Sequence, residues 1–328
     1  MHVLVTGGAG FIGSHLVDYH LSRGDRVHVI DDLSTGTLAN ISAHESNPDF
    51  QFDREDLISH GGLNEAASWA DRIYHMAAVV GVKRVLEDPV EVMRTNVAGT
   101  ERVLRAAHRS GWNPQVLIAS SSEVYGFNPD PSFSETAPLV FSAAARLRWA
   151  YAVTKLSDEY LAFAYHRGHG LPVAVARLFN TVGPRQLGRY GMVVPTFVRQ
   201  AVTGEPITVY GDGAQTRCFC DVRDTAMMLN LLVGNPAAAG EVVNVGGDRE
   251  ITIQALAELV VERTGSASPI RHIPYREAYG EEFEDIQHRR PELDKLHKLT
   301  EYELQWSLER TLDDLIDRKR RTLEQQRA

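Results

Sequence analysis

Two side chains four residues apart, Tyr151 and Lys155, have the types and the spacing of an acid–base pair. On a helix they project from the same face. An ammonium beside a phenol favours the phenolate, so we expect Lys155 to lower the pKa of Tyr151 and make it a usable base near neutral pH. Because such a pair is also common on solvated helix faces, its meaning depends on its surroundings.

A run of hydroxyl groups ending in an acid, Ser120-Ser121-Ser122-Glu123, precedes that pair in the chain. It closes an apolar stretch, Gln115–Ser120, that reads as a β-strand. Substrate sites of open α/β sheets lie at the carboxyl ends of strands. We therefore expect the serines and Tyr151 to meet at one site.

Glycines stand directly after the first predicted strand, in the segment Gly7-Gly8-Ala9-Gly10-Phe11-Ile12-Gly13. They let the turn close tightly and let a pyrophosphate approach the helix N-terminus, where free N–H groups favour anions. A glycine triplet alone is weak evidence, but its position between a strand and a helix predicts a dinucleotide site. The expected contacts are Gly7, Gly10, Phe11, Ile12 and Gly13.

Acidic residues follow the strand Arg26–Ile30 and a third strand that ends before Arg54. Asp31, followed by Asp32, lies about 20 residues after the glycines, where a carboxylate accepts from the adenosine ribose hydroxyls. A carboxylate there repels a 2′-phosphate and no arginine follows at once, so NAD is favoured over NADP. Asp56 is either an acceptor for the adenine amino group or a solvated loop acid.

Strand-like and helix-like stretches alternate through the first 180 residues. This rhythm predicts an α/β fold with a doubly wound parallel sheet of Rossmann type. The predicted strands are His2–Thr6, Arg26–Ile30, Arg72–His75, Gln115–Ser120 and Val173–Arg177, and the predicted helices are Ile12–Arg23, Val90–Ser110 and Ala150–Gly168.

The pattern changes after Arg177, where Gly, Pro and Arg punctuate the chain. We expect a smaller mixed α/β C-terminal lobe that holds the substrate. We expect residues 1–180 to form the cofactor-binding domain and residues 181–328 to form the substrate-binding lobe. This boundary is approximate, because Glu241–Val245 reads as a strand that returns to the main sheet.

Composition narrows the class of protein further. The net charge of −9 argues against nucleic acid as a partner, because phosphate backbones need a concentrated basic surface. The sequence contains no run of 18 apolar residues, so it predicts no membrane-spanning helix, and we expect a cytoplasmic protein. Cys218 and Cys220 are too few for a structural zinc site, so we expect two buried thiols and no metal.

Several motifs together resemble one family, the extended short-chain dehydrogenases/reductases, which are NAD-dependent nucleotide-sugar epimerases, dehydratases and decarboxylases. The resemblance covers nearly the whole chain. It rests on the glycine turn, Asp31-Asp32-Leu33-Ser34, His75-Met76-Ala77-Ala78, Asn96-Val97-Ala98-Gly99-Thr100, Ser122-Glu123-Val124-Tyr125-Gly126, Tyr151-x-x-x-Lys155 and Arg177-Leu178-Phe179-Asn180-Thr181-Val182-Gly183-Pro184-Arg185.

The resemblance implies an NAD that is reduced and reoxidised within one catalytic cycle. Tyr151 takes the proton of the sugar 4-hydroxyl, Ser121 or Ser122 bonds the same oxygen, and Lys155 holds the nicotinamide ribose. It implies further cofactor contacts from Leu57, Ala77, Ala78 and Asn96, and substrate contacts from Asn180, Val194, Arg185, Arg217 and Arg289. The two arginines Arg217 and Arg289 are expected at the substrate diphosphate, although either could be a surface charge. Arg185, Gln186 and Arg189 lie in a loop that closes over the substrate or is simply solvated.

Three reactions compete once C4 of the sugar is oxidised. They are epimerisation at C4, loss of water across C5–C6, and loss of carbon dioxide from a uronate. Dehydratases of the family carry Asp-Glu where this chain has Ser122-Glu123, so dehydration is disfavoured. Ser-Glu is similar to the uronic-acid decarboxylases, which favours UDP-glucuronate decarboxylation, with the 4-epimerase close behind. The family's usual C-terminal Gly-Trp-x-Pro is replaced by Leu304-Gln305-Trp306-Ser307.

Two other classes of function stay open. A non-catalytic NAD-binding protein on the same fold has no chemical need for Tyr151, Lys155 and the serines. A simple dehydrogenase releases NADH, whereas an epimerase or decarboxylase does not accumulate it. UDP is the family's commonest nucleotide, and the resemblance also implies a homodimer formed through the two long helices.

Overall fold

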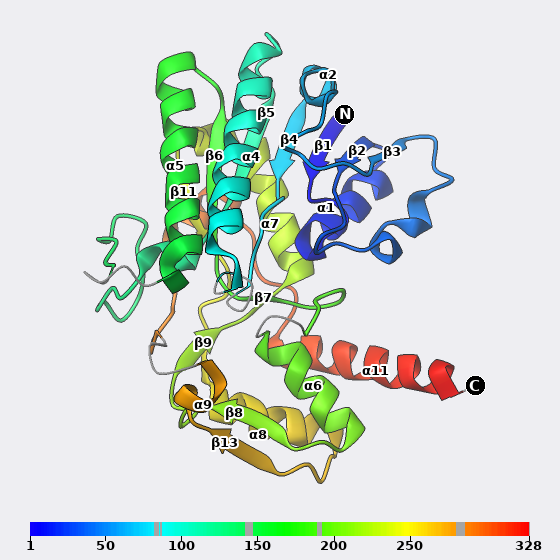
Figure 1. The fold of residues 1–328 in the computed structure, drawn as a ribbon, viewed down its shortest axis with the longest axis vertical. Helices are drawn as coiled ribbons and strands as arrows, with labels where there is room; N and C mark the ends of the chain where they lie inside the picture. The colour runs from blue at the N-terminus through cyan, green and yellow to red at the C-terminus, as the bar shows by residue number, and fades with distance from the viewer. Residues whose placement is uncertain (82–84, 86, 142–146, 189–191, 280–285, 328) are drawn as a thin grey trace.

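The computed structural model describes residues 1–81, 85, 87–141, 147–188, 192–279 and 286–327. Its centre is a seven-stranded parallel sheet in the order β11-β6-β5-β4-β1-β2-β3 (Figure 1). The strands are β1 (His2–Thr6), β2 (Arg26–Ile30), β3 (Phe50–Asp53), β4 (Arg72–His75), β5 (Gln115–Ser121), β6 (Val173–Leu178) and β11 (Val242–Val245). The predicted parallel sheet is confirmed, including the return of the strand that ends at Val245.

Helices cover both faces of this sheet, as its apolar strands require. One face packs against α1 (Phe11–Ser22) and α7 (Val222–Gly234), and the other against α2 (Leu63–Trp69), α4 (Pro89–Arg109) and α5 (Ala150–His169). The long helices α4 and α5 lie side by side (Figure 1). The strand order reverses between β1 and β4, and such a reversal opens a crevice at the carboxyl ends of the strands.

Local signals explain where the two long helices begin and end. Asp88 caps α4 by accepting from the Glu91 N–H at 3.0 Å, and Pro89 occupies the first turn. Helix α5 ends at His169 and is capped by Gly170, whose φ of 69° is a left-handed conformation that favours glycine. These bounds place Tyr151 in the first turn of α5, at the edge of the crevice.

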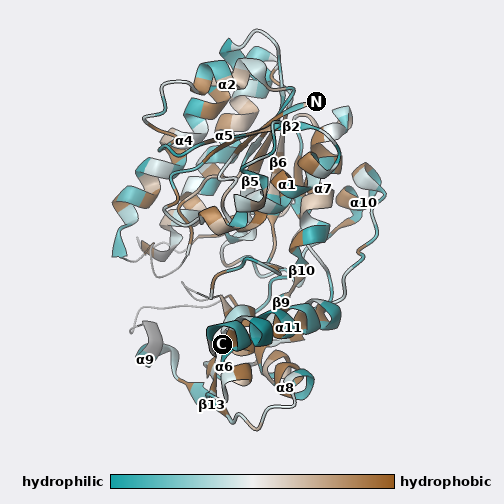
Figure 2. Cartoon of the chain, turned by 90° about the vertical axis from the view of Figure 1, so that its right-hand side faces the viewer, coloured by the Kyte–Doolittle hydropathy of each residue, from teal (hydrophilic) through white to brown (hydrophobic). Residues whose placement is uncertain are grey.

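The second part of the chain builds a smaller mixed lobe (Figure 2). Its apolar core lies between α6 (Val193–Thr203), α8 (Ile253–Thr264) and α11 (Leu308–Arg327). Three two-stranded sheets complete it, pairing β7 (Thr181–Val182) with β10 (Cys220–Asp221), β9 (Thr216–Cys218) with β12 (Glu250–Thr252), and β8 (Ile207–Tyr210) with β13 (Ile270–Ile273). The remaining helical segments are α9 (Tyr275–Tyr279), α10 (Asp294–Thr300) and the short turns Leu38–Asn40, Ser42–His44, η3 (Ser122–Tyr125), η4 (Leu147–Trp149) and Pro236–Ala238.

The structure also describes the two cysteines and the helices that were examined for membrane spans. Cys218 and Cys220 are free, buried thiols, as predicted, and burial raises the pKa of each to about 12. In the described ranges no helix combines the length and the apolar character that crossing a bilayer requires.

Candidate active site

A cavity of about 730 Å³ lies between the carboxyl ends of the sheet strands and the second lobe. Its walls include the glycine turn, Tyr151, Arg217 and Arg289. Most of the residues singled out in the sequence therefore share one space. The exceptions are Asn96 and Arg185, which do not line it.

The glycine turn fits a dinucleotide pyrophosphate. Gly7 has a φ of +72°, and a Cβ on Gly13 would lie 2.2 Å from the Gly7 carbonyl oxygen, so the close approach of turn and helix requires glycine. Helix α1 begins at Phe11 with no side-chain cap, which leaves its first N–H groups available to an anion. Gly7, Gly10, Phe11, Ile12 and Gly13 all line the cavity.

Asp31 follows the glycine turn in the chain and bonds to its backbone. Asp31 is buried at the end of β2, and its two oxygens accept from the Ala9 N–H at 2.9 Å and the Leu33 N–H at 2.8 Å. Burial raises the pKa of Asp31 above its ordinary value. The Gly10 backbone N–H bonds the same carboxylate. A carboxylate offers about four acceptor positions, so Asp31 fixes the turn and still retains acceptor capacity for a ribose hydroxyl.

Asp32 and Asp56 are exposed at the cavity edge. Asp32 accepts from the Ser34 N–H at 2.8 Å, and Asp56 from the Ile58 N–H at 2.6 Å. Leu57, Ala77 and Ala78 line the same end of the cavity.

Asn96 supports the cavity wall from behind. It is buried in α4, accepts from the Val79 N–H at 2.7 Å and donates to the Val79 carbonyl at 3.2 Å and to Thr154 Oγ1 at 3.1 Å. These bonds use both ends of its amide. Asn96 thus holds the segment around Val79, and its direct contact with the cofactor stays a prediction.

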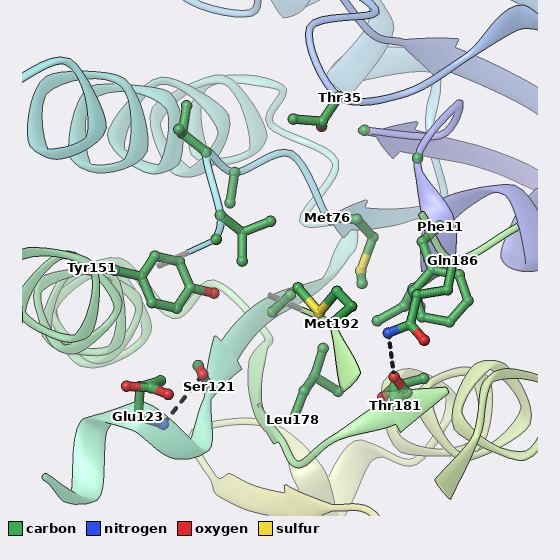
Figure 3. Close-up of a pocket in the computed structure, with 18 of the residues that line it drawn as sticks. Phe11, Thr35, Met76, Ser121, Glu123, Tyr151, Leu178, Thr181, Gln186 and Met192 are labelled. Atoms are coloured by element: carbon green, nitrogen blue, oxygen red, sulfur yellow. Dashed lines mark hydrogen bonds between the residues drawn. The ribbon is translucent and has the colours of Figure 1, made fainter. Parts of the chain in front are cut away.

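The reacting groups meet where β5 ends and α5 begins. Figure 3 shows the Tyr151 hydroxyl pointing into the cavity, with Ser121 and Glu123 below the tyrosine in this view. Ser121 Oγ accepts from the Glu123 N–H at 3.2 Å, and Ser121 is also a hydrogen-bond partner of Tyr151. Ser122 is buried at the start of η3 and lines the same wall. Of the two candidate serines, Ser121 is the one bonded to Tyr151.

The expected net lowering of the Tyr151 pKa is wrong for this structure. Burial is the largest influence and raises the pKa of the phenol, while Lys155 acts in the predicted direction and lowers it. The carboxylates of Glu123 and Asp158 add to the rise. Spacing in the sequence reveals the neighbouring cation but not the loss of water around the hydroxyl, and here the second effect is the larger.

A buried carboxylate accompanies Lys155. Its Nζ lies 3.1 Å from Asp158 Oδ2, and the two side chains are 2 % and 0 % exposed. Burial lowers the pKa of Lys155, but Asp158 and Tyr151 raise it by more, so the net shift is upward and the ammonium is retained. Asp158 was not among the residues singled out from the sequence, although its spacing of three residues from Lys155 on one helix is a visible signal.

A second pair joins residues far apart in the chain. Arg289 Nη2 donates to Glu123 Oε1 at 2.5 Å, with the two side chains 9 % and 20 % exposed. The segment after Arg289 is anchored by a bridge between Phe133 and Pro291. This arrangement puts the Arg289 cation beside the reacting groups, a juxtaposition that no sequence motif predicts.

The remaining substrate candidates divide into two groups. Asn180, Val194 and Arg217 line the cavity, and Arg217 Nη1 donates to the Ile286 carbonyl at 2.8 Å. Arg185 does not line the cavity and donates to Asp18 on α1 at 2.7 Å, and its contact with the substrate stays a prediction. Arg189 lies outside the described residues. Lining residues that the sequence did not single out include Met192, Thr208, Tyr210, Gln215 and Tyr275.

A family model described as the NAD-dependent epimerase/dehydratase family matches residues 3–246. This chain belongs to that family. NAD is the cofactor, in agreement with the uncapped start of α1 and the glycine turn. Among the described residues no three candidate ligands gather into a metal site.

Individual members of the NAD-dependent epimerase/dehydratase family are similar over most of the chain. UDP-N-acetyl-alpha-D-glucosaminuronate decarboxylase of Bacillus cytotoxicus is 36 % identical over 315 residues, covering 95 % of this chain and 96 % of the relative. UDP-glucuronic acid decarboxylase 2 of Arabidopsis thaliana is 37 % identical over 319 residues, covering 96 % of this chain and 67 % of the relative. A structure of UDP-glucuronic acid 4-epimerase from Bacillus cereus with UDP-glucuronic acid and NAD aligns with a TM-score of 0.86 at 28 % identity, covering 98 % of this chain and 100 % of that chain.

Proposed function

We propose that this protein is an NAD-dependent decarboxylase of a UDP-linked uronic acid, with UDP-glucuronate as the first candidate. The pairing of Glu123 with Arg289 beside Tyr151 carries the proposal. In a uronate, C6 is joined to C4 through C5 alone, so the group that binds the C6 carboxylate must lie next to the group that acts on C4. Arg289 satisfies this requirement.

The chemistry of Arg289 suits a carboxylate in particular. Its guanidinium is a planar fork that pairs with carboxylates, and the side chain is only 9 % exposed, so its charge is little screened by water. A neutral hydroxymethyl group at C6 would give this cation no new partner. We therefore assign Arg289 to the sugar carboxylate and Arg217 and Asn180 to the diphosphate, which revises the expectation that both arginines bind the diphosphate.

The first half of the reaction follows from the positions of Tyr151 and Ser121. Tyr151 takes the proton from the sugar 4-hydroxyl while Ser121 donates to the same oxygen, and Lys155 steadies the resulting charge. NAD, when bound, accepts the C4 hydride and later returns it. The product is a 4-ketone placed β to the C6 carboxylate.

The second half is the loss of carbon dioxide. The C5–C6 bond breaks, its electron pair moves to C5 and onto the C4 oxygen, and carbon dioxide leaves. Tyr151, now protonated, stabilises that oxygen. Glu123 is ionised beside Arg289 and its side chain is 20 % exposed, so it takes a proton from water and passes that proton to C5. Hydride return to C4 and proton return from Tyr151 complete a cycle with no net oxidation.

A 4-epimerase of the same uronate is the second candidate. The likeness to the UDP-glucuronic acid 4-epimerase favours it, and its first step is identical. The two candidates differ only in whether the 4-ketone loses C6 or turns and is reduced on its other face.

The deciding experiment incubates the purified protein with NAD and UDP-glucuronate, and in parallel with UDP-N-acetylglucosaminuronate. Products are identified by mass spectrometry and proton NMR. Formation of a UDP-pentose, absent in Tyr151→Phe, supports the proposal, and the preferred substrate reveals the group tolerated at C2. An unchanged mass with inverted C4 would overturn it in favour of the epimerase.

Glu123→Ser separates the two halves of the reaction. We expect this variant to oxidise C4, detected as reduced-nicotinamide absorbance in a single turnover, but to release at least about 100-fold less carbon dioxide, the scale of a lost acid–base group. Arg289→Lys is the matched variant at the partner position, because it keeps the charge and loses the fork. Carbon dioxide release at the wild-type rate from Glu123→Ser would remove Glu123 from the mechanism.

We further propose a division of labour within the chain and an assembly. Residues 1–180 bind NAD and residues 181–328 hold the nucleotide sugar, with α7 and β11 crossing back to the first part. Two copies associate through α4 and α5, whose surfaces expose Val90 (74 %), Met93 (43 %) and Tyr160 (70 %). Light scattering that gives the mass of one chain would contradict the assembly.

A further inference from the structure

One face of α1 is bonded to the loop that follows β7. His15 Nε2 donates to the Pro184 carbonyl at 3.1 Å, and Arg185 Nη2 donates to Asp18 Oδ2 at 2.7 Å. His15 and Asp18 lie four and seven residues after Phe11, a spacing that aligns all three on one face of the helix. The face that begins at the glycine turn therefore continues into the contact with this loop.

The loop is held from its other side as well. Gly183 has a φ of +145°, and a Cβ there would lie 2.7 Å from Val222 Cγ1 on α7. Gln186 Nε2 donates to the Thr181 carbonyl at 2.9 Å, a bond visible in Figure 3. Residues 183–188 are thus fixed between α7 and α1.

Arg185 adopts an unfavourable arrangement to reach Asp18. Its φ of 71° is a left-handed conformation that side-chain-bearing residues rarely adopt. Its Nη1 is buried and has no hydrogen-bond partner among the described residues. Both features cost free energy, and such strain concentrates at functional positions.

The loop passes over the cofactor end of the cavity. Phe11 and Ile12, in the first turn of α1, line that end together with Gln186 and Gly188. Asp18 has a further partner, because its other carboxylate oxygen, Oδ1, lies 2.7 Å from His44 Nε2.

We propose that His15, Asp18 and Arg185 form a latch that holds residues 183–188 across the start of α1 and slows the departure of NAD. An enzyme that takes a hydride and returns it to the same sugar loses the turnover if the reduced cofactor escapes. The latch acts between α1 and the loop, so it is a positioning device and not a set of reacting groups. The inference does not depend on which sugar is the substrate.

The test measures exchange of bound NAD for isotope-labelled NAD by mass spectrometry, without substrate, in the full-length protein. We expect Asp18→Asn and Arg185→Ala to exchange about fivefold faster than wild type, the size that one partly exposed ion pair supports. The double exchange Asp18→Arg with Arg185→Asp restores the slow rate. Arg26→Ala is the control, because it breaks an exposed ion pair with Asp49 outside the cavity.

A second readout follows NADH captured by an added NADH oxidase during turnover. Captured NADH rises in Asp18→Asn and Arg185→Ala and stays at the wild-type level in Arg26→Ala. Exchange rates unchanged in both single variants would overturn the latch. So would an equal acceleration in Arg26→Ala, or a double exchange variant that is folded by circular dichroism and still exchanges fast. His15→Gln, which keeps a donor, provides a milder variant if either charge variant fails to fold.

Discussion

The two ends of the cavity are built in different ways. The pyrophosphate cradle at the cofactor end is made of backbone from adjoining residues, Gly7 to Gly13 and the first N–H groups of α1. The substrate end is made of side chains from distant segments, such as Glu123 and Arg289, which lie 166 residues apart. Local geometry thus defines one end, and long-range packing defines the other.

This difference indicates which changes the two ends tolerate. A backbone cradle is destroyed by adding a single Cβ, whereas a side-chain site loses one function at a time. Variants at the two ends should therefore separate cofactor retention from chemistry.

Tyr151→Phe should give the largest effect, since it removes the base and leaves the glycine turn untouched. We expect kcat to fall by roughly 10³-fold, within the range for a positioned acid–base group. Bound NAD per chain, measured by mass spectrometry of the denatured protein, stays close to wild type. A variant that loses NAD in proportion to its activity would show that the two ends are not separable.

Gly13→Ala should act in the opposite way. The added Cβ lies 2.2 Å from the Gly7 carbonyl oxygen, so the turn must open. We expect NAD affinity to fall by about 100-fold, equivalent to about 2.7 kcal/mol, measured by titration calorimetry. Gly168→Ala is the matched control because its Cβ meets nothing within 4 Å. Equal affinities in the two variants would contradict the backbone account.

Lys155→Met tests the pKa balance at the substrate end. Phenolate is the active base, so the rate rises with pH until the pKa of Tyr151 is reached. Burial holds that pKa above its ordinary value and Lys155 lowers it, so removing the cation moves the rising limb to higher pH. A displacement of about one pH unit lowers the rate near neutral pH by about tenfold. A pH–rate profile whose limb stays in place would exclude Lys155 as the tuning group.

Asp56→Asn should give the smallest effect. The carboxylate is exposed at the cofactor end and already accepts from the Ile58 N–H, so a single further bond to adenine contributes little. We expect NAD affinity to fall less than about fivefold, with kcat unchanged at saturating NAD. A loss as large as that of Gly13→Ala would show that side chains, too, define this end.

The sequence alone was sufficient for the features that adjoining residues determine. The glycine turn, the parallel strands and the Tyr151–Lys155 spacing follow from local backbone geometry and periodicity, and all three occur in the structure where they were expected. The strand returning at Val245 was also visible, because its apolar run has the pattern of a buried parallel strand.

The tertiary structure decided what depends on burial and distant partners. It turned Arg185 toward Asp18, joined Arg289 to Glu123, and buried the Tyr151 hydroxyl enough to raise its pKa despite Lys155. The reason is physical. Backbone conformation is set by neighbours in the chain, whereas desolvation and ion pairing depend on which segments packing brings together, and a linear pattern carries little information about either.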